Sequence, residues 1–142
     1  MNGLLRNYYY NALISMKQGI NRNGEKNMAK PVLLLSIFEY IEREEIRENK
    51  IKYDQIVEGY NNFNEKLGWT LASVNYPFYF LTSDGFYHLK WKGKPIKTNN
   101  PTGKLIRENV EYAYLDDALW NLLQNVSVRE EYREAIISHY LK

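Results

Sequence analysis

The fold is decided by the stretch Pro31-Val32-Leu33-Leu34-Leu35-Ser36-Ile37-Phe38, the longest apolar run in the chain. Proline suits the first turn of a helix, because the N–H group that it lacks has no helical partner there. The residues that follow, up to Ile41, are apolar on nearly every side of the predicted helix. We therefore expect this helix at the centre of the core. The run is far shorter than the roughly 20 residues that span a bilayer.

Amphipathic helices are expected on either side of this central helix. Apolar residues at helical spacing predict a helix over residues 3–17 that ends near Gly19, and a polar loop over residues 20–27. A short strand at residues 51–53 is followed by Asp54, a good N-cap for another helix. The apolar face of the first helix holds Leu4, Leu5, Tyr8, Ala12 and Met16. The apolar face of the helix after Asp54 holds Ile56, Val57, Tyr60, Phe63 and Leu67.

Two aromatic-rich runs, residues 76–81 and 86–92, are separated by a short segment that ends in Asp84-Gly85. Asp-Gly between such runs is a strong hairpin signal, so we expect an antiparallel β-hairpin. In the second run one face is apolar and the other is largely basic. The apolar face holds Tyr87, Leu89 and Trp91, and the other face holds Phe86, His88, Lys90 and Lys92.

The rest of the chain reads as a loop followed by three helices. Prolines, glycines and asparagines mark the loop at residues 93–103, and helices are expected over residues 105–115, 116–124 and 128–141. Asp116 would cap the second of these helices, and a capping box at residues 127–130 would begin the third. The sequence thus predicts one α+β domain over residues 1–142, rich in helix, with a small antiparallel hairpin or sheet.

The residue inventory argues against catalysis. There is no cysteine, which excludes disulfides, thiol nucleophiles and cysteine zinc sites and suits a reducing cytoplasm. The two histidines, His88 and His139, are not at metal-ligand spacing, and no phosphate loop or nucleophile-elbow motif is present. We expect no catalytic residue, no metal and no cofactor, and no membrane association.

Charge is segregated along the chain although the net charge is only +2. Residues 86–107 contain no acidic residue, and before residue 39 the only acidic residue is Glu25. Acid-free stretches of this kind indicate a polyanionic partner such as DNA, although a solvated basic face is the simpler alternative. The basic residues of the stretch 86–107 are Lys90, Lys92, Lys94, Lys97, Lys104 and Arg107.

Two further segments are candidates for binding. If Pro31 opens a helix, the unpaired N–H groups of Val32, Leu33 and Leu34, with Lys30 in front of them, would form a seat for an anion. An ordinary helix start that follows a lysine is the simpler alternative. In the aromatic run that begins at residue 76, the proline would enforce an extended chain and form a stiff apolar ledge. Core packing and a ligand platform both remain open for that ledge.

Several motifs together resemble the sulfur-binding domain, a family that accompanies HNH nuclease domains in modification-dependent restriction enzymes. The likeness covers nearly the whole chain and depends on the order and spacing of the motifs. They are Ala29-Lys30-Pro31-Val32-Leu33-Leu34-Leu35, Asn75-Tyr76-Pro77-Phe78, Asp84-Gly85-Phe86-Tyr87-His88-Leu89, Leu105-Ile106-Arg107-Glu108, Ala113-Tyr114-Leu115-Asp116 and Arg129-Glu130-Glu131.

The resemblance implies a reader of double-stranded DNA in which a sulfur replaces one non-bridging phosphate oxygen. Tyr76 and Pro77, with Phe78, would form an apolar ledge for the sulfur, and Lys30, at the step before Pro31, would pair with the modified phosphate or its neighbours. Residues implied as further phosphate contacts are Arg22, Lys90, Lys92 and Arg107. The domain would recognise DNA without cutting it, and a linked nuclease domain or a separate subunit would cleave.

One position departs from the family pattern. The family commonly has histidine directly before the basic residue and proline, and this chain has Ala29. Either the cavity is completed differently, or the sequence preference has shifted, or sulfur recognition is weakened or lost. A protein-interaction module and a metal-dependent nuclease with unrecognised carboxylate ligands therefore stay as alternatives. DNA binding should weaken steeply with salt, whereas an apolar protein interface should not.

Overall fold

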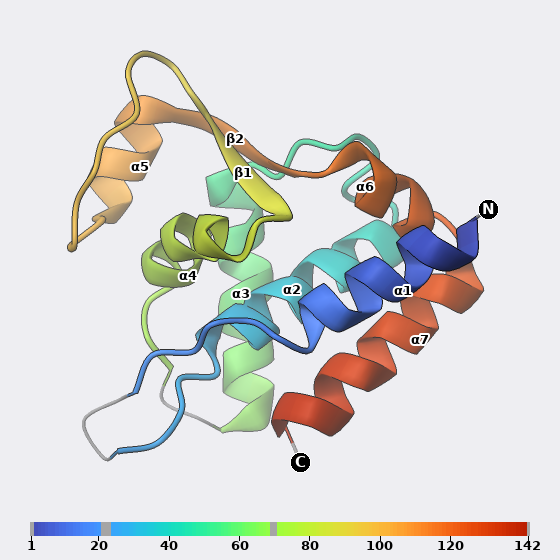
Figure 1. Ribbon diagram of the computed structural model, residues 1–142. Coiled ribbons are helices and arrows are strands. Elements are labelled where there is room, and N and C mark those ends of the chain that lie inside the picture. The colour runs from blue at the N-terminus through green and yellow to red at the C-terminus, as the bar shows by residue number, and fades with distance from the viewer. Residues whose placement is uncertain (1, 21–23, 69–70, 142) are drawn as a thin grey trace.

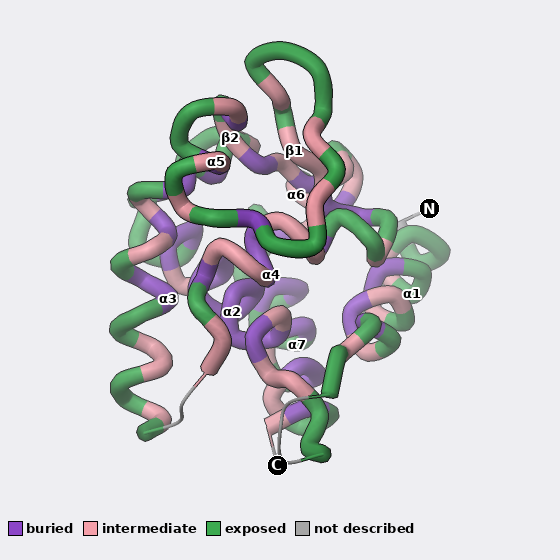
Figure 2. Tube along the Cα trace, turned by 90° about the vertical axis from the view of Figure 1, so that its left-hand side faces the viewer, coloured by how far each residue is buried: buried purple, intermediate pink, exposed green. Residues whose placement is uncertain are grey.

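Helix α2 (Ala29–Glu42) lies at the centre of the computed structural model, which describes residues 2–20, 24–68 and 71–141. It contacts α3 (Tyr53–Leu67), α4 (Asn75–Phe80) and α7 (Val126–Ile136), so apolar neighbours surround it on several sides (Figure 1). Residues 31–38 are all buried, as the continuous purple stretch of α2 in Figure 2 shows. The prediction of a central buried helix is confirmed, although the helix begins two residues before Pro31.

Helix α1 (Asn2–Leu13) packs on α7 and on α6 (Asp117–Leu123), and it is shorter than the predicted helix over residues 3–17. Tertiary contacts end it. The Tyr140 hydroxyl donates to the Leu13 carbonyl at 2.6 Å and accepts from the Met16 N–H at 2.9 Å. The N–H of Lys17 donates to Asp84 Oδ1 at 2.7 Å. In a continuing helix that N–H would instead meet the Leu13 carbonyl.

The predicted hairpin between residues 76–81 and 86–92 is wrong. The first of these runs forms α4 and a 3₁₀ turn, η1 (Leu81–Asp84), while β1 (Tyr87–Trp91) pairs antiparallel with β2 (Val110–Leu115). Pro77 is the third residue of α4, where its missing N–H costs no helical hydrogen bond. Gly85 has a left-handed φ of 91° and ends the 3₁₀ turn. Asp84-Gly85 is therefore a helix stop and not a hairpin turn.

The predicted helix over residues 105–115 is correct only in its first half. Residues of α5 (Gly103–Asn109) are helical, and the chain then becomes strand β2. Ile51 exchanges two backbone hydrogen bonds with Ala113, so β2 is paired on both edges at this point. Valine and tyrosines in β2 suit a strand once these partners are present. The strand expected at residues 51–53 shrinks to this bridge, and the helix that follows is capped at Lys52 and not at Asp54.

The C-terminal helices agree in position with the prediction and differ in their caps. Asp116 precedes α6, but its carboxylate binds side chains instead of the helix amides. Asn125 caps α7 by accepting from the Val128 N–H at 3.1 Å, in place of the expected capping box, and a π-helical turn, η2 (Ile137–Leu141), follows. The α+β class with a small antiparallel sheet is confirmed. Within the described residues no helix combines the length and apolar character that a membrane span needs.

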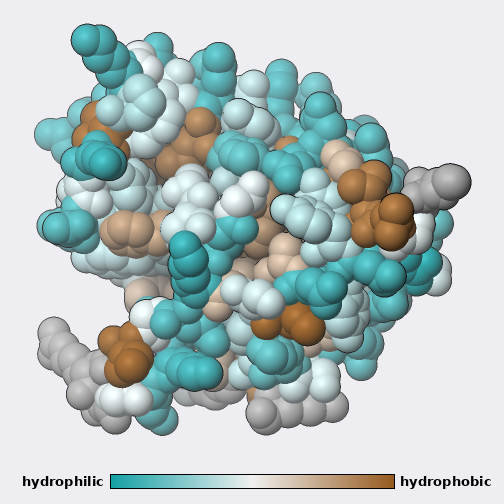
Figure 3. All heavy atoms as spheres, viewed as in Figure 1, coloured by the Kyte–Doolittle hydropathy of each residue, from teal (hydrophilic) through white to brown (hydrophobic). Residues whose placement is uncertain are grey.

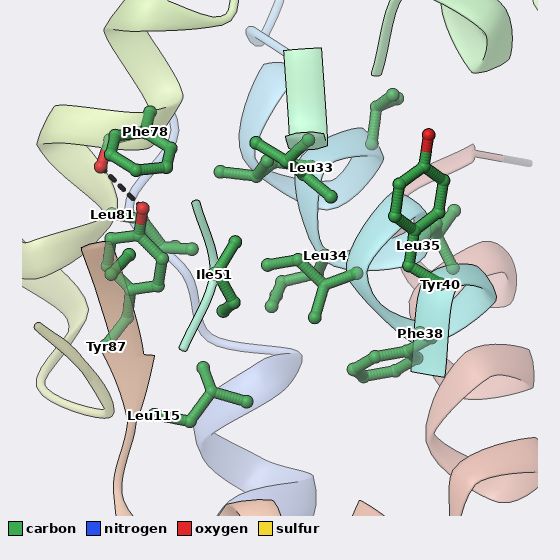
Figure 4. Packing of buried hydrophobic residues seen from close by; sticks show 14 of the residues in the cluster. Leu33, Leu34, Leu35, Phe38, Tyr40, Ile51, Phe78, Leu81, Tyr87 and Leu115 are labelled. Atoms are coloured by element: carbon green, nitrogen blue, oxygen red, sulfur yellow. Dashed lines mark hydrogen bonds between the residues drawn. The ribbon is translucent and has the colours of Figure 1, made fainter. Parts of the chain in front are cut away.

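The hydrophobic core lies between α2 and the two-stranded sheet. Figure 4 shows Leu34 of α2 beside Ile51, and the Phe78 ring next to the Tyr87 ring at the side of α4. The two rings are edge-on. The Tyr87 hydroxyl donates to the Phe78 carbonyl at 2.7 Å, which ties β1 to α4. This tie holds α4 on the sheet, and α4 also packs on α2, so that the two helices meet at the candidate site.

Candidate nucleic-acid interface

A solvent-open hollow of about 570 Å³ lies where α2 and α4 begin. Ala29 and Lys30 line it from α2, and Tyr76, Pro77 and Phe80 line it from α4. Residues 17–19 and Asn27 form its other wall, together with Ala72 and Ser83. Ala29, Lys30, Tyr76 and Pro77, which the resemblance selects, thus meet in one hollow. Its walls combine apolar carbon with the polar groups of Lys30, Ser83 and residues 17–18.

Helical geometry explains how α4 presents its side chains. Tyr76 and Phe80 are four residues apart and Pro77 is three residues before Phe80, so the three side chains share one side of the helix. The Tyr76 hydroxyl donates to Asn100 Oδ1 at 2.8 Å, and the Tyr79 hydroxyl donates to the Ile96 carbonyl at 2.7 Å. These bonds tie α4 to the loop at residues 92–102. The ledge predicted as an extended segment is therefore a helix face.

The start of α2 differs from the predicted anion seat. Because α2 begins at Ala29, the Val32 N–H is already used within the helix and donates to the Met28 carbonyl at 3.2 Å. The Ala29 N–H donates to Asn27 Oδ1 at 2.8 Å. A seat built from the amides of residues 32–34 is thus wrong. What Ala29 contributes is a small buried side chain, 3% exposed, in the wall of the hollow.

Lys30 enters the hollow already paired. Its Nζ lies 2.6 Å from Asp84 Oδ2 and 3.2 Å from Ser83 Oγ. The side chains of Lys30 and Asp84 are only 12% and 3% exposed. Asp84 also accepts from the Lys17 N–H through its other oxygen. Asp84, expected from the sequence in a hairpin turn, thus joins η1, the start of α2 and the wall at residues 17–19.

The remaining candidates lie elsewhere. Phe78 is fully buried, with its ring edge-on to Tyr53 and Tyr87 at 5.1 and 6.2 Å between centroids, so it packs the core and does not line the hollow. Pro31 is likewise buried. Arg22 lies outside the described residues.

Arg107 and Lys92 line a second hollow of about 900 Å³, beside Lys50, Lys52 and Tyr53. The Arg107 guanidinium lies 2.7 Å from Asp54 and 5.1 Å from the centre of the Tyr53 ring. The hydrogen bond to Asp54 raises the pKa of Arg107 above its ordinary value. Lys92 Nζ donates to the Arg107 carbonyl at 3.2 Å. The structure therefore separates these bases from the hollow at α4.

His88 and Asp116 form a second polar cluster with Tyr9. Asp116 accepts from the Tyr9 hydroxyl at 2.8 Å, and its other oxygen lies 2.6 Å from His88 Nε2. Burial and the bond to Asp116 raise the pKa of Tyr9 well above its ordinary value. These contacts join α1, β1 and the start of α6. Among the residues that the structure describes, no group of three or more histidine, aspartate or glutamate side chains could hold a metal ion.

Sequence reasoning missed several residues of the hollow. Phe80 could have been found by helical spacing from Tyr76, had residues 75–80 been assigned to a helix. Gln18, Asn27 and Ala72 carry no local signal, because loops bring them to the site.

The chain matches no protein-family model and no curated protein. Among solved structures it superposes on "Sulfur binding domain of ScoMcrA complexed with phosphorothioated DNA" with a TM-score of 0.74. The match has 18% identity and covers 94% of this chain and 87% of that chain. This chain has the sulfur-binding-domain fold. The resemblance expected from the sequence is thus confirmed for the fold.

Two further structures with this fold agree. The sulfur binding domain of SprMcrA, also complexed with phosphorothioated DNA, has a TM-score of 0.74 at 17% identity over 96% of this chain and 86% of that chain. The Type IV phosphorothioation-dependent restriction endonuclease ScoMcrA has a TM-score of 0.73 at 17% identity, and the match covers 94% of this chain and 29% of that chain. In ScoMcrA the sulfur-binding fold is therefore one part of a longer protein.

Proposed function

We propose that this chain is a recognition domain for double-stranded DNA that carries a phosphorothioate linkage in its backbone. The observation that carries the proposal is the hollow in which Ala29, Pro77 and Phe80 surround the paired Lys30. Structures with the same fold are described as complexed with phosphorothioated DNA.

The walls of the hollow suit sulfur better than oxygen. Sulfur is larger, more polarizable and a poorer hydrogen-bond acceptor, so its entry into an apolar site costs less hydration. The methyl group of Ala29, the Pro77 ring and the Phe80 ring supply the apolar carbon. Alanine in place of the family's histidine leaves this wall free of a polar ring. Selectivity would then depend on the larger desolvation cost of the oxygen.

Basic groups would hold the rest of the DNA backbone. Lysine has three N–H donors, of which Asp84 and Ser83 use two, so one donor of Lys30 remains for the modified phosphate. Lys90, Lys92 and Arg107 would contact phosphates farther along the duplex, and Arg22 is proposed from the sequence for the same role. Such contacts supply affinity that does not depend on sequence.

An apolar protein-docking surface has less support. Figure 3 shows a mostly polar face on which apolar side chains occur in small separate groups. Extended apolar patches are the usual sign of protein interaction sites, and this face has none of that kind. The context that we propose is restriction of modified DNA, in which a linked nuclease domain or a separate nuclease subunit cuts.

Fluorescence anisotropy with two matched duplexes tests the proposal. One duplex carries a single Rp phosphorothioate and the other an ordinary phosphate. We expect tighter binding to the sulfur duplex, and a loss of this preference in Tyr76→Ala and Pro77→Ala. Tyr8→Ala is the matched control, because Tyr8 is 64% exposed on α1 and lies outside the hollow. Equal affinity of the unmodified protein for both duplexes would overturn the proposal.

A nuclease assay completes the test. The same duplexes are incubated with the protein and a divalent metal, and the products are separated on a denaturing gel. We expect intact strands, since recognition without cleavage is proposed. Strand scission above a mock preparation would contradict this part of the proposal.

A further inference from the structure

We propose that Asp84 sets the preference of the hollow for sulfur over oxygen by holding Lys30 in a neutral ion pair. This inference rests on the proposed function and concerns the same site. It assigns a specificity role to a residue that does not itself line the hollow.

The geometry places Asp84 behind Lys30. The carboxylate is 3% exposed and lies 2.6 Å from Nζ, whereas Lys30 and Ser83 face the hollow. A phosphate that enters the hollow therefore meets the ammonium group from one side while Asp84 holds it from the other. The pair carries no net charge, so Lys30 attracts an anion less than it would without Asp84.

The pairing is held from several directions. Asp84 Oδ1 accepts from the Lys17 N–H at 2.7 Å, which fixes the carboxylate against the wall at residues 17–19. Ser83 Oγ, on the same turn, takes a second N–H of Lys30 at 3.2 Å. Lys30 cannot move toward a ligand without leaving both partners. Of the three N–H donors of Lys30, only one is therefore left for a ligand.

Fewer available N–H donors on Lys30 affect the ordinary phosphate and the phosphorothioate unequally. Both carry one negative charge, but the ordinary phosphate oxygen loses more hydration when it enters an apolar site. It needs a charge-assisted hydrogen bond to offset that loss, and such bonds are the strong ones. Sulfur, a weaker acceptor, depends less on the donor. A free Lys30 would thus improve binding of the oxygen more than binding of the sulfur.

The test measures, for Asp84→Asn, the ratio of the affinity for the sulfur duplex to the affinity for the ordinary duplex. Asparagine keeps an oxygen that accepts from the Lys17 N–H but removes the negative charge. We expect affinity for the ordinary duplex to rise on the order of tenfold and affinity for the sulfur duplex to rise less, so that the ratio falls. The salt slope on the ordinary duplex should steepen by about 0.9, as for one additional phosphate contact.

Asp117→Asn is the matched control. Asp117 is exposed in the first turn of α6, away from α4 (Figure 1), and its substitution raises the net charge by the same amount. We expect the ratio of affinities to stay unchanged in this variant. A fall in the ratio equal to that of Asp84→Asn would show a general effect of charge and overturn the inference.

Two further variants test whether the effect of Asp84→Asn acts through Lys30, and one of them leaves Asp84 in place. Ser83→Ala, at an exposed position, frees one N–H of Lys30 and should lower the ratio by a smaller factor. In the double variant Lys30→Met and Asp84→Asn, the gain for the ordinary duplex should disappear. A gain that persists without Lys30, or a ratio unchanged in both Ser83→Ala and Asp84→Asn, would refute the inference.

The two proposals fail in different ways. An unmodified protein that binds both duplexes equally contradicts the proposed function itself. An unmodified protein that prefers sulfur, with the same preference in Asp84→Asn and Ser83→Ala, contradicts only the role of Asp84. Thermal unfolding of each variant shows whether Asp84→Asn is folded, and Ser83→Ala decides the outcome if it is not.

Discussion

Phe78 and Phe80 lie two residues apart on α4, and the same substitution to alanine should have opposite consequences at the two positions. Phe78 is 0% exposed and is edge-on to two tyrosine rings, whereas Phe80 is partly buried and lines the hollow. Phe78→Ala should lower stability and leave the preference for sulfur intact in the folded protein. Phe80→Ala should do the reverse.

The magnitudes follow from burial. Truncation of a fully buried phenylalanine to alanine lowers the free energy of unfolding by about 3–5 kcal/mol. Each aromatic pair that is lost contributes about 0.5–1.5 kcal/mol. We expect about 4 kcal/mol for Phe78→Ala. Phe80 buries only part of its ring, so Phe80→Ala should cost on the order of 1 kcal/mol. With a urea m-value of about 2 kcal/mol/M, the larger loss lowers the midpoint by about 2 M.

Urea unfolding followed by circular dichroism measures the first effect, and anisotropy with the two matched duplexes measures the second. The binding assay is carried out well below the midpoint of each variant, so that both proteins are folded. The reasoning is refuted if Phe80→Ala keeps the full preference for sulfur. It is equally refuted if Phe78→Ala unfolds at the midpoint of the unmodified protein.

Three further predictions concern pH, packing and charge. Burial raises the pKa of Tyr132 from 10.0 to about 12, so the folded protein keeps a proton that the unfolded chain loses. This contribution to stability is complete below pH 10 and should be lost as the pH rises to 12, as urea midpoints across that range will show. Gly59→Ala would place a Cβ 2.7 Å from Tyr40 Cε1 and should cost about 1–3 kcal/mol in thermal unfolding, whereas Gly93→Ala, with open space around it, should change little. Lys90→Ala should weaken both duplexes alike and reduce the salt slope by about 0.9, and an effect confined to the sulfur duplex would contradict its proposed role.

Helix periodicity and first-turn prolines predicted the central helix and the positions of several others. Pro31 falls in the first turn of α2 as expected, and the apolar residues after it are buried on all sides. The extended chain predicted at Pro77 is wrong, because this proline also stands in the first turn of a helix. A run of six residues with four aromatics has no period that separates strand from helix.

The sequence indicated several residues of the candidate site but not how the fold arranges them. The resemblance selected Ala29, Lys30, Tyr76 and Pro77, and the structure brings these four into one hollow. Phe78 was selected with them, yet it faces the core because side chains along a helix point in different directions. The contribution of Phe80 depends on the same geometry and was therefore missed.

The sequence alone determined which segments are apolar enough to be buried, where the central helix begins to within two residues, and that acidic residues are nearly absent from two stretches. These are local properties, set by composition and by spacing along a few turns. Only the tertiary structure decided that β1 pairs with β2, that α1 stops at Leu13, and that Lys30 meets Asp84 across 54 positions of sequence. Strand pairing and ion pairing join residues that are distant in the chain, so the partner is chosen by how the whole core packs and not by the residues beside it.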